Sequence, residues 1–113
     1  MARCAALSRS ADGSAWTDLW DCTAGSFRWH YSVNETIHVI DGGAIVTDRD
    51  GTVWDLAPGD VMQFLVGTEA LWQVPRYVRK IAFSSEPVRS PLVRLLQSNH
   101  RINRLANKVF RYA

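Results

Sequence analysis

Three side chains close together in the sequence, Arg28, His30 and Glu35, are of types that bind and activate small anions. In the stretch FRWHY (27–31), strand alternation places Arg28 and His30 on one face, which we expect to be the interior face. A guanidinium binds carboxylate or phosphate through paired hydrogen bonds, and an imidazole exchanges a proton near neutral pH. The pattern predicts an anion pocket in which Glu35 pairs with Arg28. The alternative is a buried polar network without a ligand.

Two residues further along the chain join the candidate ligand set. We expect Gln63 and Trp72 to share the interior face with Ala70, and Trp72 either stacks on a ligand or packs in the core. His38 follows Glu35 by three residues and is expected on the opposite face. Lys80, in the last predicted strand, either reaches the mouth of the interior or is solvated, and the sequence leaves both open.

Short segments rich in β-branched and aromatic residues carry these side chains and predict strands. Turn residues separate the segments, and Asp50-Gly51 predicts a tight hairpin because glycine adopts the positive φ of such turns. Strands at this spacing predict an all-β sandwich or barrel. The predicted strands are FRWHY (27–31), TIHVI (36–40), AIVTD (44–48), TVWDL (52–56), VMQFLV (61–66), ALWQV (70–74) and VRKIAF (78–83).

The 113 residues predict one domain with three parts. Residues 1–15 are small and polar and are expected to be loose, and residues 16–86 form the barrel. Residues 87–113 predict a basic amphipathic helix that starts at Ser90-Pro91, or two short helices broken near residues 98–100. Residues 1–86 carry 7 basic and 11 acidic side chains, whereas the tail carries 6 basic and none acidic. We expect the tail to be a solvated face or an intersubunit contact, since it lacks interleaved aromatics for nucleic acid.

Four stretches of the chain together resemble a known fold family. The chain resembles the small single-domain cupins of the ureidoglycine aminohydrolase and ethanolamine-utilisation types. The resemblance implies an all-β cupin jelly-roll β-barrel, to which the predicted C-terminal α-helical segment is added. The matching stretches are WDCTAGSFRW (20–29), ETIHVIDGGAIVTDRDG (35–51), LAPGDVMQFLVGTEALWQV (56–74) and YVRKIAF (77–83).

The resemblance also implies where a metal would be held. The ligand positions of the cupin pattern fall on Arg28, His30, Glu35 and Ala70, so His30 and Glu35 remain as the residual ligand positions. A first-row metal needs three or four ligands, and a guanidinium repels a dication. We therefore expect no tightly bound metal and no other cofactor. A divalent transition metal at these positions is the alternative.

These observations predict a protein that binds a small polar or anionic metabolite in the barrel without a complete metal site. Whether it also catalyses a reaction stays open. One alternative is a metal-dependent small-molecule cupin enzyme. The ureidoglycine aminohydrolase pattern, however, has a carboxylate and a glutamine where this chain has Arg28 and Ala70. The other alternative is a non-catalytic dimerising module.

The sequence also suggests the partners and the cellular location of the protein. We expect a homodimer, because open strand edges and the apolar stripe of the tail invite pairing. No stretch approaches the roughly 20 apolar residues that span a bilayer, so no membrane contact is expected. Residues 1–11 contain no apolar stretch long enough for a secretory signal, so none is expected, and Cys4 and Cys22 are expected to be reduced thiols. The expected location is the cytoplasm.

Overall fold

The structure, a computed structural model, describes residues 1–87, and this part of the chain consists of strands joined by turns. No helix in the described residues is long and apolar enough to cross a membrane. The predicted helical tail lies, from residue 88 onward, outside the described residues. The strands are β1 (Ala2–Arg9), β2 (Ala15–His30), β3 (Asn34–Gly42), β4 (Ala44–Thr47), β5 (Val53–Leu56), β6 (Val61–Phe64) and β7 (Glu69–Ser85).

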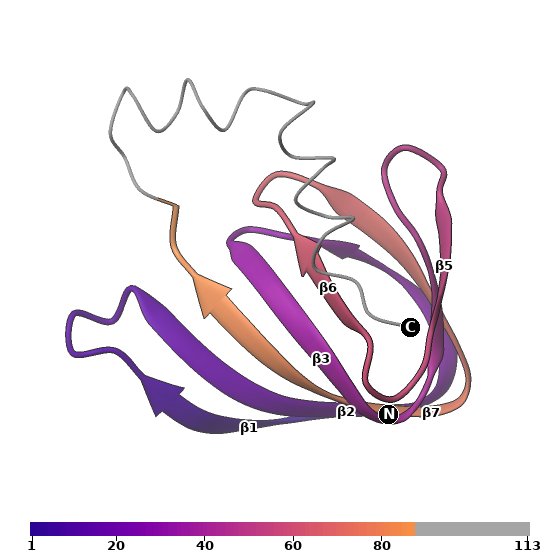
Figure 1. The fold of residues 1–113 in the computed structure, drawn as a ribbon, viewed down its shortest axis with the longest axis horizontal. Coiled ribbons are helices and arrows are strands. Elements are labelled where there is room, and N and C mark those ends of the chain that lie inside the picture. Colours follow the sequence, from indigo (N-terminus) through magenta and orange to yellow (C-terminus); the bar gives the residue numbers. More distant parts are fainter. Residues whose placement is uncertain (88–113) are drawn as a thin grey trace.

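Two long strands, β2 and β7, organise the fold. They pair antiparallel along almost their whole length, and the ladder is interrupted where Thr23 pairs with Tyr77 and Gly25 with Val74. Pro75 lies at this irregularity, where the lack of a backbone donor is tolerated. The first half of β7 also pairs with β4, and its second half pairs with β3. Figure 1 shows β7 curving around the molecule, so the two long strands contribute to both walls of the barrel.

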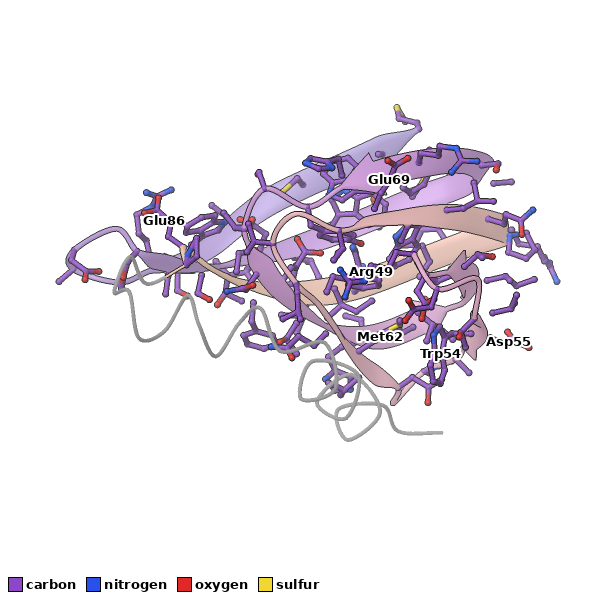
Figure 2. All side chains as sticks on the ribbon, turned by 90° about the horizontal axis from the view of Figure 1, so that it is seen from above. Arg49, Trp54, Asp55, Met62, Glu69 and Glu86 are labelled. Carbon is purple, nitrogen blue, oxygen red and sulfur yellow. The ribbon has the colours of Figure 1, made fainter. Side chains whose placement is uncertain are left out.

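The ends of β7 show how far this curved strand extends. Figure 2 shows Glu69, its first residue, well separated from Glu86, which directly follows its last residue. The strand order β1-β2-β7-β3-β6, with β4 and β5 joined through β7, makes one antiparallel sheet. The prediction of an all-β fold is confirmed for the described residues.

Turn chemistry in the sequence is also confirmed. β4 and β5 form an antiparallel hairpin around Asp50-Gly51, and Gly51 has a φ of 81°. Gly42 has a φ of 70°, and a Cβ at that position would collide with the carbonyl oxygen of Tyr77 on β7. This glycine therefore allows β3 to end in close contact with β7.

The core lies between the two walls and is rich in aromatic rings. Tyr31 and Phe64 stack with ring centroids 4.5 Å apart, and Phe27 lies parallel to Trp72 at 6.1 Å. Burial of each large side chain contributes roughly 1.5 to 3 kcal/mol to folding. The buried hydrophobic residues are Cys22, Tyr31, Ile37, Val39, Ala44, Val46, Leu56, Met62, Phe64, Ala70, Trp72, Val74, Val78 and Ala82.

The N-terminal segment differs from the sequence-based expectation. Residues 1–15 were expected to be loose, but Ala2–Arg9 form β1, which pairs antiparallel with β2 at the edge of the sheet (Figure 1). Every residue of β1 is exposed, so burial of apolar side chains does not hold it there. β1 is held at the edge of the sheet by its backbone pairing with β2 and by the contact of Arg3 with Asp21. Neither interaction produces a hydrophobic pattern that could be recognised in the sequence.

Candidate functional site

The inward and outward faces of FRWHY are the reverse of the prediction. Tyr31 is buried and Phe27 packs against the core, whereas Arg28 and His30 are exposed. The guanidinium of Arg28 lies 3.7 Å from the carboxylate of Glu69, and the Arg28 side chain is 71% exposed. The predicted ion pair between Arg28 and Glu35 inside the barrel is therefore wrong. Burial of rings releases free energy, whereas burial of a guanidinium costs free energy unless it is fully paired.

Lys80 takes the interior position that was assigned to Arg28. It is buried on β7, and its Nζ lies 3.5 Å from Oε2 of Glu35, which comes from β3. The side chains of Lys80 and Glu35 are only 8% and 15% exposed. Nζ also lies 4.5 Å from the ring centroids of both Trp20 and Trp72, a distance at which a cation is attracted to a ring face.

The strand register explains why these groups meet. On β2 and β7, Trp20 pairs directly with Lys80, and Phe27 pairs directly with Trp72. Paired residues in a sheet point to the same face, so two rings of β2 face the lysine and the indole of β7. Trp20 and Phe27 are seven residues apart, and the register shift between Thr23 and Gly25 allows both pairs to face the same cavity.

The electrostatics of Lys80 combine two opposing effects. Burial lowers the pKa of the lysine, and the nearby carboxylate of Glu35 acts against this by favouring the ammonium form. The separation of 3.5 Å exceeds the roughly 2.7 to 2.9 Å of a short charge-assisted hydrogen bond. The pair is thus close enough to interact but loose enough for a ligand oxygen to approach the ammonium.

A cavity of about 200 Å³ opens beside this pair. Its inner part includes the buried Tyr31, Trp72, Lys80 and Ala82, and its outer part includes the exposed Cys4. The volume far exceeds the roughly 10 to 15 Å³ that one water needs, and it is below that of typical drug-sized sites. The lining residues are Cys4, Asp18, Trp20, Phe27, Trp29, Tyr31, Glu35, Trp72, Lys80 and Ala82.

A hydrogen bond fixes two rings of the cavity. Nε1–H of Trp72 donates to the hydroxyl oxygen of Tyr31 over 3.0 Å, and both side chains are buried. Burial raises the pKa of Tyr31, and the negative charge of Glu35 adds to this effect. The phenol therefore stays neutral and keeps its own proton as a possible donor.

The remaining candidates from the sequence lie in different places. Trp72 lies in the cavity wall and also in the core, so both predicted roles apply to the same side chain. Gln63 is not in this cavity, because Met62 and Phe64 are the buried residues of β6 and Gln63 alternates with them. It lines a separate hollow of about 20 Å³. His38 lies between the buried Ile37 and Val39, and strand alternation directs it away from the interior.

The residues present do not fit the metal of the cupin pattern. His30 is exposed, Ala70 offers a methyl group, and Glu35 faces the ammonium of Lys80. Within residues 1–87 no group of three or more His, Cys, Asp or Glu side chains could hold a metal ion. A cation fixed beside the one inward carboxylate of the pattern would oppose a second cation there.

A plain signal for the correct faces was present in the sequence. The aromatic residues of FRWHY alternate with polar ones, and the ordinary rule of apolar side chains inward gives the observed orientation. Lys80 had no such signal, since its neighbours Arg79 and Ile81 mix polar and apolar types. Its inward position depends on the β2–β7 register, in which it pairs with Trp20.

Comparisons with known proteins agree with this architecture. The model of the EutQ-like cupin domain matches residues 9–82. The structure of a putative ethanolamine utilization protein EutQ from Salmonella typhimurium superposes with a TM-score of 0.66 at 22% identity, covering 74% of this chain and 68% of that one. Clostridium difficile EutQ gives a TM-score of 0.66 at 20% identity, covering 75% of this chain and 68% of that one.

A third structure has a higher sequence identity over a shorter stretch. A DUF861 family protein from Thermotoga maritima is 33% identical, covers 57% of this chain and 73% of its own, and has a TM-score of 0.54. A comparison with curated protein sequences gives no match. The family match spans well over half of the chain and includes β2 to β6 and most of β7. The chain therefore belongs to the family of EutQ-like cupin domains.

Proposed function

We propose that the barrel binds a small metabolite that has an apolar body and an oxygen acceptor, with Lys80 as the group that recognises the oxygen. The observation that carries this proposal is the buried Lys80–Glu35 pair at the wall of an aromatic cavity. Buried charges are costly in a fold unless they are paired, and concave sites with a few convergent polar groups are where ligands bind.

The lining favours particular ligands. Trp20, Phe27 and Trp72 offer ring faces and edges to an apolar body. A carboxylate or carbonyl oxygen of the ligand would accept a hydrogen bond from Lys80 and share or replace Glu35 as its partner. The cavity volume of about 200 Å³ limits the ligand to a small molecule. Arg28, which was the expected anion anchor, has no part in this proposal because it is exposed.

The metal-dependent alternative has no supporting observation in the described residues. Its ligand positions hold an exposed arginine, an exposed histidine and an alanine, and the remaining glutamate pairs with a lysine. A barrel that binds its ligand through Lys80 needs no metal for recognition, so binding without a metal is the function that the site supports best.

The proposal is tested by calorimetry and thermal unfolding with three matched four-carbon probes: butanoate, butyramide and butan-1-ol. Butanoate and butyramide carry an acceptor oxygen on a carbonyl carbon, and we expect both to bind more tightly than the alcohol. Lys80→Met should abolish this preference, whereas the exposed Arg28→Met should leave it unchanged. Absence of binding to all three probes, or a preference that survives Lys80→Met, would overturn the proposal.

Assembly and location remain proposals of the same kind. We propose a homodimer that pairs along the exposed edge strand β1, since an unpaired edge offers backbone groups to a second copy. Light scattering should give twice the chain mass, and a proline at Ala5 in the centre of β1 should reduce it. A cytoplasmic location is supported by Cys4 and Cys22, which are both free thiols.

A further inference from the structure

We propose that Lys80 is a carbonyl-reactive lysine, which captures a small neutral aldehyde or ketone in the cavity as an imine. This inference rests on the proposed function, because it assigns the chemical class of the ligand of the same cavity. It goes beyond binding, because it gives Lys80 a covalent step and Glu35 a role in proton transfer.

The position of the amine carries the inference. Nζ of Lys80 is held between the rings of Trp20 and Trp72 at 4.5 Å from each centroid, and it lies beside a cavity of about 200 Å³. A lysine placed in an apolar pocket is the arrangement in which amines form Schiff bases with carbonyl substrates. The rings restrict the side chain, so the amine is already positioned when a ligand enters.

Glu35 is placed to move the proton that the step requires. Its Oε2 lies 3.5 Å from Nζ and accepts the proton of the ammonium, leaving a neutral amine with a free electron pair. The amine adds to the carbonyl carbon, the electron pair of the C=O bond goes to oxygen, and a proton moves from the new ammonium nitrogen to that oxygen to give a neutral carbinolamine. Glu35 then returns its proton to the hydroxyl, which leaves as water while the nitrogen electron pair forms the C=N bond. The products are a protonated imine beside the Glu35 carboxylate and one water, without an oxidant or reductant.

Burial supports the same reading. Desolvation lowers the pKa of Lys80 and so favours the neutral amine, which is the form that attacks a carbonyl carbon. Glu35 acts in the opposite direction and favours the ammonium form. Replacement of Glu35 by glutamine should slow the loss of water from the carbinolamine, because an amide has no acidic proton to return.

The chain offers an internal reference for the test, because it contains two lysines, Lys80 and Lys108. The purified 113-residue protein is incubated at pH 7 with butanal and cyanoborohydride, which reduces an imine to a stable amine. Peptide mass spectrometry then compares the two lysines over time. We expect Lys80 to be modified at least about tenfold faster than Lys108, and the two rates to converge when the chain is unfolded in guanidinium. Equal or slower modification of native Lys80 would overturn the inference.

A second measurement separates this inference from the proposed function. Butyramide has the same four-carbon skeleton as butanal but does not form an imine. Binding of butyramide without faster capture of butanal at Lys80 would overturn the covalent step and leave the binding function intact. If butyramide does not bind and butanal is not captured, both proposals fail together.

Discussion

Two ion pairs on the same sheet have very different surroundings. At the edge, Arg3 holds Asp21 through two hydrogen bonds, Nε to Oδ1 at 3.0 Å and Nη2 to Oδ2 at 2.6 Å, and the hydroxyl of Tyr77 donates to Oδ2 at 2.9 Å. In the barrel, Lys80 and Glu35 lie 3.5 Å apart beside a cavity.

The difference separates a structural contact from a candidate site. The Arg3–Asp21 contact joins β1 to β2 and satisfies the carboxylate with short bonds, and the Arg3 side chain is 67% exposed. Bidentate geometry of this kind fixes two elements relative to one another. The Lys80–Glu35 pair is more deeply buried and less tightly bonded, so its charges remain available to a ligand. Bond distances and burial therefore distinguish the two pairs better than the mere presence of opposite charges does.

The largest expected effect comes from breaking the buried pair. Glu35→Leu leaves the Lys80 amine buried without its carboxylate and should lower the free energy of unfolding by about 3 kcal/mol. The double variant Glu35→Leu, Lys80→Met should cost clearly less, because no lone charge remains. Denaturant titration of both single variants and the double variant measures the coupling. Single losses that simply add would show that the two side chains do not interact.

A smaller loss is expected within the aromatic wall. Tyr31→Phe removes the hydroxyl that accepts from Trp72 and leaves the buried indole N–H without this acceptor. The expected loss is about 1 to 2 kcal/mol of unfolding free energy, measured by denaturant titration. Unchanged stability of Tyr31→Phe would contradict the role of this bond.

The contribution of the Arg3–Asp21 contact to stability should depend on pH. Hydrogen bonds from Arg3 and then Tyr77 lower the pKa of Asp21 to about 2 from its ordinary value of 3.8. The native state thus favours the carboxylate, and this stabilisation is present above pH 4 and lost as the pH falls towards 2. The stability difference between the native sequence and Asp21→Asn should shrink over this range, as measured by thermal unfolding. Arg3→Met should show the same pH dependence as Asp21→Asn. A stability difference that does not change with pH would contradict a stabilising role of the Arg3–Asp21 contact.

The smallest effects are expected at the residues that the cupin pattern places in a metal site. Arg28→Met and His30→Ala change exposed side chains and should alter stability by less than about 0.5 kcal/mol. Binding of the four-carbon probes should also stay unchanged in calorimetry. A clear loss of binding in either variant would show that the ligand does not bind beside Lys80.

Much of the fold could be predicted because turn and strand signals act locally. Asp50-Gly51 and the alternating segments placed β3 to β6 near their observed positions. The edge strand β1 was not predicted because all its side chains are exposed. The inward position of Lys80 was not predicted because only the register with Trp20 directs its side chain inward. Glu35 and Trp72 were named correctly as inward residues, whereas Arg28, His30 and Gln63 were placed on the wrong face. The cupin ligand positions had suggested that Arg28 and His30 face the interior, but the preference of the neighbouring aromatic rings for the interior decides the orientation of this strand.

The central claim is that ligands bind beside Lys80 and not on the face of Arg28 and His30. The five tryptophans allow a direct test, because Trp20, Trp29 and Trp72 line the cavity whereas Trp16 and Trp54 do not. Titration with butyramide, followed by nuclear magnetic resonance of the indole N–H groups, should shift the signals of Trp20 and Trp72 and leave those of Trp16 and Trp54 in place. Shifts at the His30 imidazole without shifts at Trp20 and Trp72 would contradict the claim.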